Sequence, residues 1–169
     1  MNFGDPFGLC SEDVGGDGKT ETVRDCPDDV KSSWAETHIV VNPNTNWEDV
    51  DADLREAVLL ASMELRKTFY ISAGLEEGAP HVPTTAHGAG RAADISRING
   101  TRFADMNATT ARMLGNQVGA TIANFLPTGR AMEVFTPGMA FRLDRFLSLV
   151  SRRRLMASHW NHVHVSVQP

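Results

Sequence analysis

Apolar residues recur at helical spacing in three stretches of the chain. The pattern predicts one helix from Trp47 to Lys67, a second from Asn107 or Thr109 to Phe125, and a third from Phe141 to Leu155. Asn46 stands where an N-cap is expected for the first helix, and the acidic residues that follow it suit the helix dipole. These helices are expected to supply one layer of the core.

Shorter apolar runs between these stretches predict β-strands. They lie at Thr37–Val41, Phe69–Ser72, Ala92–Ile98 and Arg130–Phe135. A last strand near the C-terminus alternates strictly, with valines at 163, 165 and 167 and with His162, His164 and Ser166 between them. The valines are therefore expected to face the core and the histidines a cleft. Helices and strands mix without regular βαβ alternation, which favours an α+β fold with a small antiparallel sheet and flanking helices.

The length and charge of the chain narrow its class. A chain of 169 residues is expected to form one domain after a leader, divided here as 1–33 and 34–169. A net charge of −5 argues against nucleic acid as the main partner. The sequence contains no run of 18 apolar residues, so no membrane span is predicted. It also contains no basic segment followed by an apolar one, so no signal peptide is predicted. We expect a monomer.

The only two cysteines, Cys10 and Cys26, bracket a stretch rich in glycine and aspartate. A disulfide between them would close a loop of about 15 residues and contribute roughly 3 kcal/mol in the chain-entropy model. We predict that this bond forms, which would imply an oxidising compartment. The alternative is two unpaired thiols in a flexible leader.

Histidines gather in two places that together suggest a metal site. His87 and Asp94 stand seven positions apart, with mostly small residues between them, and His159, His162 and His164 lie near the C-terminus. Neutral imidazoles and one carboxylate are what zinc takes in a three-ligand catalytic site. Two histidines at i and i+2 of a strand lie roughly 6.5–7 Å apart, so one can bind a metal while the other reaches a water or substrate on it. His159 breaks the alternation and is expected where the chain enters the strand.

The segment Thr85-Ala86-His87-Gly88-Ala89-Gly90-Arg91-Ala92-Ala93-Asp94 resembles the Ser/Thr-x-His-x-x-Gly-x-Ala-x-Asp signature of the M15-type zinc peptidases, which belong with lysostaphin-like enzymes and the hedgehog fold. His162-Val163-His164 resembles the His-x-His of that group, and the spacing to His159 is similar to that in murein endopeptidases of the MepA type. The resemblance implies Zn²⁺ bound by His87, Asp94 and His164. It also implies a hedgehog/D-Ala-D-Ala-peptidase-like fold with zinc in a groove across the sheet.

The same resemblance implies a zinc metallopeptidase, either a carboxypeptidase or an endopeptidase, that hydrolyses stem-peptide or cross-link amide bonds of peptidoglycan. His162 would move a proton at the reacting water or stabilise the oxyanion, and His159 would orient or assist it. Arg91 lies within the signature and could hold a substrate carboxylate, or it could instead pair with Asp105 or Glu133 as part of the structure. His81 is expected at the rim of the site, where it could contact substrate.

The run Asp5-Pro6-Phe7-Gly8-Leu9 resembles the Asp-Pro-x-Gly-Leu junction that ends the core of Rhs/YD-repeat proteins, where a variable toxin domain follows. This resemblance implies the C-terminal antibacterial toxin domain of an Rhs-type protein, delivered by a secretion system to the envelope of a target bacterium and paired with a cognate immunity protein. Two alternatives stay open: a phage or housekeeping murein lysin of the same chemistry, and a hedgehog-like zinc-binding module without catalysis. A closed structural site would need a fourth protein ligand.

Overall fold

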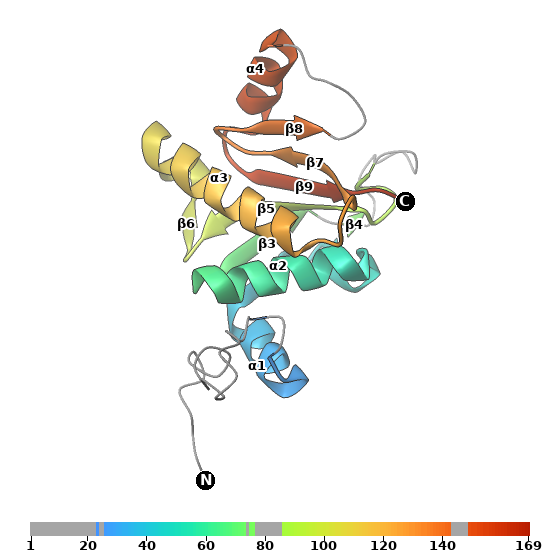
Figure 1. Ribbon diagram of the computed structural model, residues 1–169. Coiled ribbons are helices and arrows are strands. Elements are labelled where there is room, and N and C mark those ends of the chain that lie inside the picture. Colours follow the sequence, from blue (N-terminus) through green and yellow to red (C-terminus); the bar gives the residue numbers. More distant parts are fainter. Residues whose placement is uncertain (1–22, 24–25, 74, 77–85, 143–148) are drawn as a thin grey trace, which may run out of the picture.

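The computed structural model describes residue 23 and residues 26–73, 75–76, 86–142 and 149–169 (Figure 1). In this part of the chain a 7-stranded sheet has the strand order β1-β3-β5-β9-β7-β8, with β6 paired to β5. Its strands are β1 (Ile39–Val41), β3 (Phe69–Ala73), β5 (Ala92–Ile98), β6 (Thr101–Arg102), β7 (Ala131–Phe135), β8 (Ala140–Arg142) and β9 (Val163–Val167). A second small sheet pairs β2 (Thr45–Asn46) with β4 (Leu75–Glu76).

The large sheet is mixed. Only the β1–β3 pairing is parallel, and the other pairings among the described strands of this sheet are antiparallel. The predicted α+β class is therefore confirmed, whereas the predicted antiparallel sheet is correct except at the β1 edge. The strands β5 and β9 lie side by side near the middle of the sheet, so residues on them are held by neighbours on both sides.

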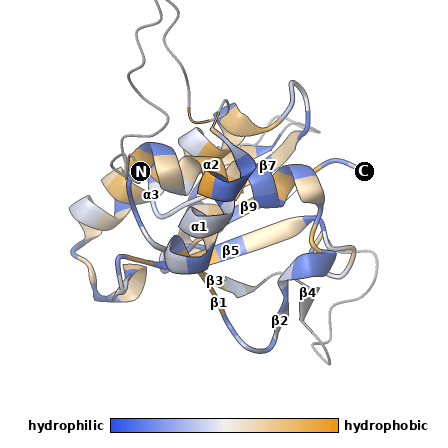
Figure 2. Ribbon diagram, turned by 90° about the horizontal axis from the view of Figure 1, so that it is seen from below, coloured by the Kyte–Doolittle hydropathy of each residue, from blue (hydrophilic) through white to orange (hydrophobic). Residues whose placement is uncertain are grey.

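Two helices cover one face of this sheet (Figure 1). They are α2 (Ala52–Leu65) and α3 (Ala108–Phe125), while α1 (Asp28–His38) lies below α2 and α4 (Leu149–Ser158) lies beside β8. Short 3-10 turns, η2 (Trp47–Asp49) and η3 (Phe103–Asp105), precede α2 and α3. The apolar sides of α2 and α3 (Figure 2) close over the core valines of β9, each 0% exposed. No helix in the described ranges is long and apolar enough to cross a membrane.

The predicted second helix is confirmed, whereas the first is shorter than predicted, since α2 starts at Ala52 and ends at Leu65. Asn107 caps α3 by accepting a hydrogen bond from the backbone N–H of Thr110 at 2.9 Å. At α2, however, the N-cap is Asp51 and not Asn46, because Val50 has extended backbone and breaks the run after η2. The Asp51 carboxylate accepts from the backbone N–H of Leu54 at 3.2 Å, a capping bond that satisfies an otherwise unpaired donor.

Two sequence predictions are wrong in their boundaries. Phe141 does not begin a helix: it lies in the edge strand β8 with its side chain 42% exposed, and the helix is described only from Leu149 to Ser158. The first strand starts at Ile39, because α1 runs on to His38. This helix begins at Asp28, inside the range 1–33 assigned to the leader. The sequence gives little apolar periodicity for this helix, because Trp34 is its one buried residue. The Trp34 Nε1–H donates to Ser62 Oγ at 2.9 Å.

Cys26 is buried and disulfide-bonded. It packs with Trp34, Leu60 and Met63 in a small cluster on the side of α2 away from the sheet. Since the sequence has one other cysteine, Cys10, this agrees with the predicted pairing. Cys10 itself and the predicted junction at residues 5–9 lie outside the described residues.

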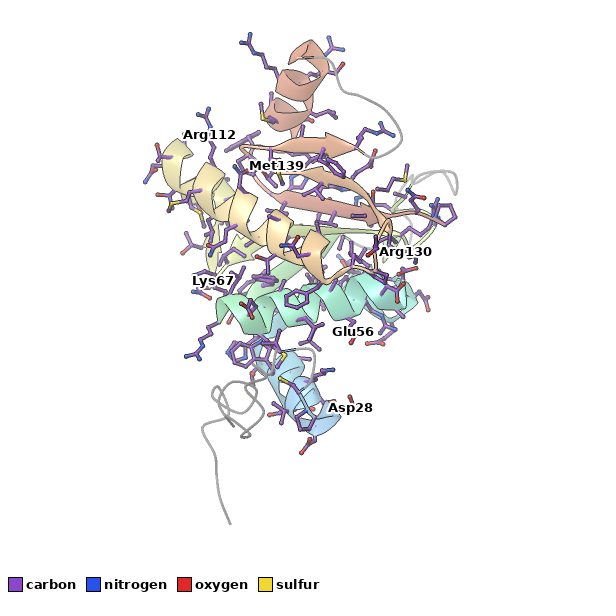
Figure 3. The ribbon with its side chains drawn as sticks, viewed as in Figure 1. Asp28, Glu56, Lys67, Arg112, Arg130 and Met139 are labelled. Carbon is purple, nitrogen blue, oxygen red and sulfur yellow. The ribbon has the colours of Figure 1, made fainter. Side chains whose placement is uncertain are left out.

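Arg130, at the start of β7, joins three parts of the chain that meet beside the start of α2 (Figure 3). Its guanidinium donates to the carboxylates of Asp51 at 2.7 Å and Asp53 at 3.2 Å, and to the backbone carbonyl of Gln168 at 2.6 Å. The N-cap of α2 and the end of β9 are thereby tied to one side chain. The same Asp51 holds the loop that carries His87, as described next.

Candidate metal centre

The register between β5 and β9 places Asp94 directly opposite His164. Side chains alternate along a strand, so these two residues share one face of the sheet while Ala93 and Val165, their paired neighbours, share the other. The latter pair is fully buried in the core. The prediction that the valines of β9 face the core is therefore confirmed. His164 is itself 6% exposed, so the opposite face is covered at this point.

His87 reaches this face from a tight turn. The turn is closed by hydrogen bonds from Gly90 N–H to the His87 carbonyl at 2.9 Å and from Arg91 N–H to the Ala86 carbonyl at 2.7 Å. Gly90 has φ +67°, and a Cβ added to it would lie 2.6 Å from the Asp49 carbonyl oxygen. Its own carbonyl accepts from Asp51 N–H at 2.7 Å. Only glycine fits this approach, and the turn is thereby fastened to the start of α2.

Three candidate ligand atoms converge where these elements meet. His87 Nε2 lies 3.2 Å from His164 Nδ1 and 3.4 Å from Asp94 Oδ1, and His164 Nδ1 lies 2.8 Å from Asp94 Oδ1. For bonds of about 2.0–2.1 Å, the ligand atoms of a tetrahedral zinc ion are about 3.3–3.4 Å apart. Two of the three separations match this spacing, and the third is a hydrogen-bond distance. The trio could therefore hold a metal ion.

The charges at the trio favour a cation. Burial alone would raise the pKa of Asp94, but hydrogen bonds from His164 and His87 lower it well below its usual range, so the carboxylate is ionised. Burial alone would lower the pKa of His164, but hydrogen bonds to Asp94 and Glu133 outweigh it and raise the value to about 9. Without a metal, His164 thus carries the positive charge between two carboxylates. A divalent ion bound by the trio would take over that charge and displace the Nδ1 proton.

Glu133 is a site residue that the sequence analysis did not identify in this role. Its Oε2 lies 3.5 Å from His164 Nε2 and 3.3 Å from the hydroxyl oxygen of Ser166. Its Oε1 pairs with Arg142 at 2.9 Å. The hydrogen bond from His164 is the main cause that lowers the pKa of Glu133, against the effect of burial. A carboxylate on the far nitrogen of a metal-binding imidazole fixes the ring and raises its basicity.

His159 and His162 flank the trio with their ring orientations fixed. His162 Nδ1 lies 2.8 Å from the Asn161 amide oxygen, and its Nε2 lies 3.9 Å from Asp94 Oδ1. His159 Nδ1 lies 2.7 Å from the Leu155 carbonyl oxygen, and its ring packs 4.8 Å from that of His162. Both Nδ1 atoms face acceptors, so each neutral ring keeps its lone pair on Nε2. Burial lowers the pKa of both residues, which favours these neutral forms.

Arg91, one of the two residues predicted to contact substrate, does not join the hydrogen bonds around His164 in the described part of the chain. Glu133 pairs with Arg142, and in the described part of the chain Arg91 makes no ion pair. The backbone of Arg91 instead joins the turn to β9, since its carbonyl accepts from Val167 N–H at 2.9 Å. Its role toward substrate stays a prediction. His81 lies outside the described residues.

Comparison with protein-family models, curated proteins and solved structures finds no match for this chain. The geometry of the trio, its neighbours and the sequence motifs are therefore what point to a function.

The close approach of Gly90 predicts how the turn supports metal binding. A positive φ costs a non-glycine residue about 1–2 kcal/mol, so both Gly90→Ala and Gly129→Ala, at φ +67° and +82°, should lower the free energy of unfolding. Only Gly90→Ala also collides with backbone, because nothing lies within 4 Å of a Cβ at Gly129. Metal ligands must be held within about 0.5 Å, so zinc affinity should fall in Gly90→Ala and stay unchanged in Gly129→Ala. Chelator competition measures this, and equal affinities would contradict it.

The position of Glu133 predicts a second effect on metal affinity. Glu133→Gln keeps the shape of the side chain but removes the charge beside His164 Nε2. Outer carboxylates of this kind typically contribute about 10–100-fold to metal affinity, and we expect a loss in that range by the same chelator competition. The control is Glu48→Gln, a side chain 81% exposed and paired with Arg55, which should bind zinc as the wild type does. Unchanged affinity in Glu133→Gln would remove Glu133 from the site.

Proposed function

We propose that this chain is a zinc-dependent peptidase that hydrolyses amide bonds in the stem peptides or cross-links of peptidoglycan. The observation that carries the proposal is the convergence of His87 Nε2, Asp94 Oδ1 and His164 Nδ1 at separations of 2.8–3.4 Å. Two imidazoles and one carboxylate are the donor set of catalytic zinc sites, which keep one position open for water or substrate. In the described residues the metal-ligand group has these three members and no fourth, as such a site requires.

The neutral histidines beside the trio argue for catalysis over a purely structural role. Zinc held by the trio would polarise a substrate carbonyl and make a water acidic enough to attack at neutral pH. His162 presents an unprotonated Nε2 near Asp94, where it can accept a proton from that water and pass it to the leaving amine. His159 packs against His162 and is assigned to positioning it.

The choice of peptidoglycan rests on the resemblance of the segment from Thr85 to Asp94 and of the His-x-His to the M15-type peptidases. The resemblance of residues 5–9 to the Rhs junction extends the proposal to an antibacterial toxin domain with a cognate immunity protein. A phage or housekeeping lysin would share the chemistry but would lack an immunity partner encoded next to it. Mass spectrometry of digested peptidoglycan would identify which amide bond is cut.

The site predicts different losses for its three C-terminal histidines. His162→Ala should keep its zinc and lose about 10²–10⁴-fold in turnover, the usual contribution of a general acid or base. His164→Ala should lose both zinc and activity, because it removes a ligand and the partner of both carboxylates. His159→Ala should give an intermediate loss with zinc retained. Elemental analysis and muropeptide turnover, measured together on all three variants, check this pattern.

Several outcomes would contradict these roles. A metal-free His162→Ala protein would make His162 a ligand. A fully active His162→Ala with an inactive His159→Ala would exchange the two roles. If the wild type binds zinc but hydrolyses no muropeptide, the chain is a metal-binding module without this activity.

A further inference from the structure

A hollow of about 530 Å³ opens beside the metal centre on the same face of the sheet. Asn161, whose amide oxygen faces His162, lines one part of it. Ser72 lines another part, and its hydroxyl donates to the backbone carbonyl of Asp94 at 3.3 Å. The hollow is therefore lined by residues that hydrogen-bond to His162 and Asp94, and it extends along β3 and β5.

A β-bulge turns an arginine into this hollow. The β3–β5 register pairs Ile71 with Ile95 and then Tyr70 with Arg97, so Ser96 is the extra residue. Ile95 and Ile98 are buried in the core, while Ser96 and Arg97 both line the hollow. Strict alternation would have put Arg97 on the core face with Ile95. A bulge is a recurrent means of re-aiming a side chain beside an active site.

Two positive charges face each other at the far end of the hollow. Arg97 is paired across the strands with Arg102, and both line the hollow. Like charges directly opposite one another destabilise a sheet, and in the described part of the chain neither arginine has an acidic partner. The Arg97 guanidinium carbon lies 5.8 Å from the centre of the Tyr70 ring. That contact can steady the flat face of the guanidinium and leaves its N–H groups for an anion.

We propose that Arg97 and Arg102 bind a carboxylate of the peptide substrate and so select acidic peptides. This inference rests on the proposed peptidase function. Arg97 follows Asp94 by three positions on β5, which is about 10 Å along the strand. An extended peptide covers about 3.3–3.6 Å per residue. The selected carboxylate therefore belongs two or three residues from the bond that is cut.

The test measures peptide binding separately from hydrolysis. Two fluorescent peptide pairs serve as probes: a synthetic peptidoglycan stem pentapeptide with free or amidated side carboxylates, and an alanine hexapeptide with one central Glu or Gln. Charge-assisted hydrogen bonds should give the wild type roughly a 10- to 100-fold preference for the acidic member of at least one pair. The preference should shrink at high salt, because these arginines are partly or fully open to solvent.

Arg97→Gln combined with Arg102→Gln should abolish this preference and leave the zinc content unchanged. Arg154→Gln is the matched control, since it removes an exposed arginine on α4 and should keep the preference. Equal binding of both members of both pairs by the wild type would overturn the inference. So would a preference that survives in the double variant. Preferred binding of acidic peptides without hydrolysis would support the arginine pair and refute only the peptidase function.

Discussion

The register between β5 and β9 is the constraint on which the candidate metal centre depends. It sets Asp94 against His164 and leaves their neighbours, Ala93 and Val165, in the core. A slip of one residue would move every side chain of β9 to the other face, so that His164 would enter the core and the valines would leave it. The apolar core under α2 and α3 thus enforces the pairing that the site needs. The fold is stabilised by the valines, and the histidine is positioned as a consequence.

Charge compensation is the second requirement of this site. Asp94 and Glu133 approach His164 from its two ring nitrogens. Buried charges are tolerated only when they are paired, and here the imidazole supplies the compensating positive charge. The arrangement explains why His164, with a raised pKa, stands beside two histidines whose pKa values are lowered. The His164 ring is held between the two carboxylates, while the rings of His159 and His162 stay neutral and able to accept a proton.

Much of the fold and of the candidate metal centre could be predicted from local sequence. Strict alternation identified which face of β9 packs into the apolar core, and the predicted bounds of β5, Ala92–Ile98, match those observed. The convergence of His87, Asp94 and His164 also agrees with the motif-based ligand set. Features that depend on pairing between distant strands were missed. Glu133 reaches His164 only through the β7–β9 register, and Arg97 faces the hollow only because of a bulge. The cap at Asp51 was missed because Val50 interrupts the helical run.

We propose that these three side chains, from one turn and two strands, bind one catalytic zinc ion. Crystals grown with zinc and measured on both sides of its absorption edge test this most directly. We expect a single anomalous peak per chain, about 2.0–2.2 Å from His87 Nε2, Asp94 Oδ1 and His164 Nδ1, with an open position toward His162. A peak ligated by His162 or His159 in place of one of the three, or no peak between them at full zinc saturation, would contradict it.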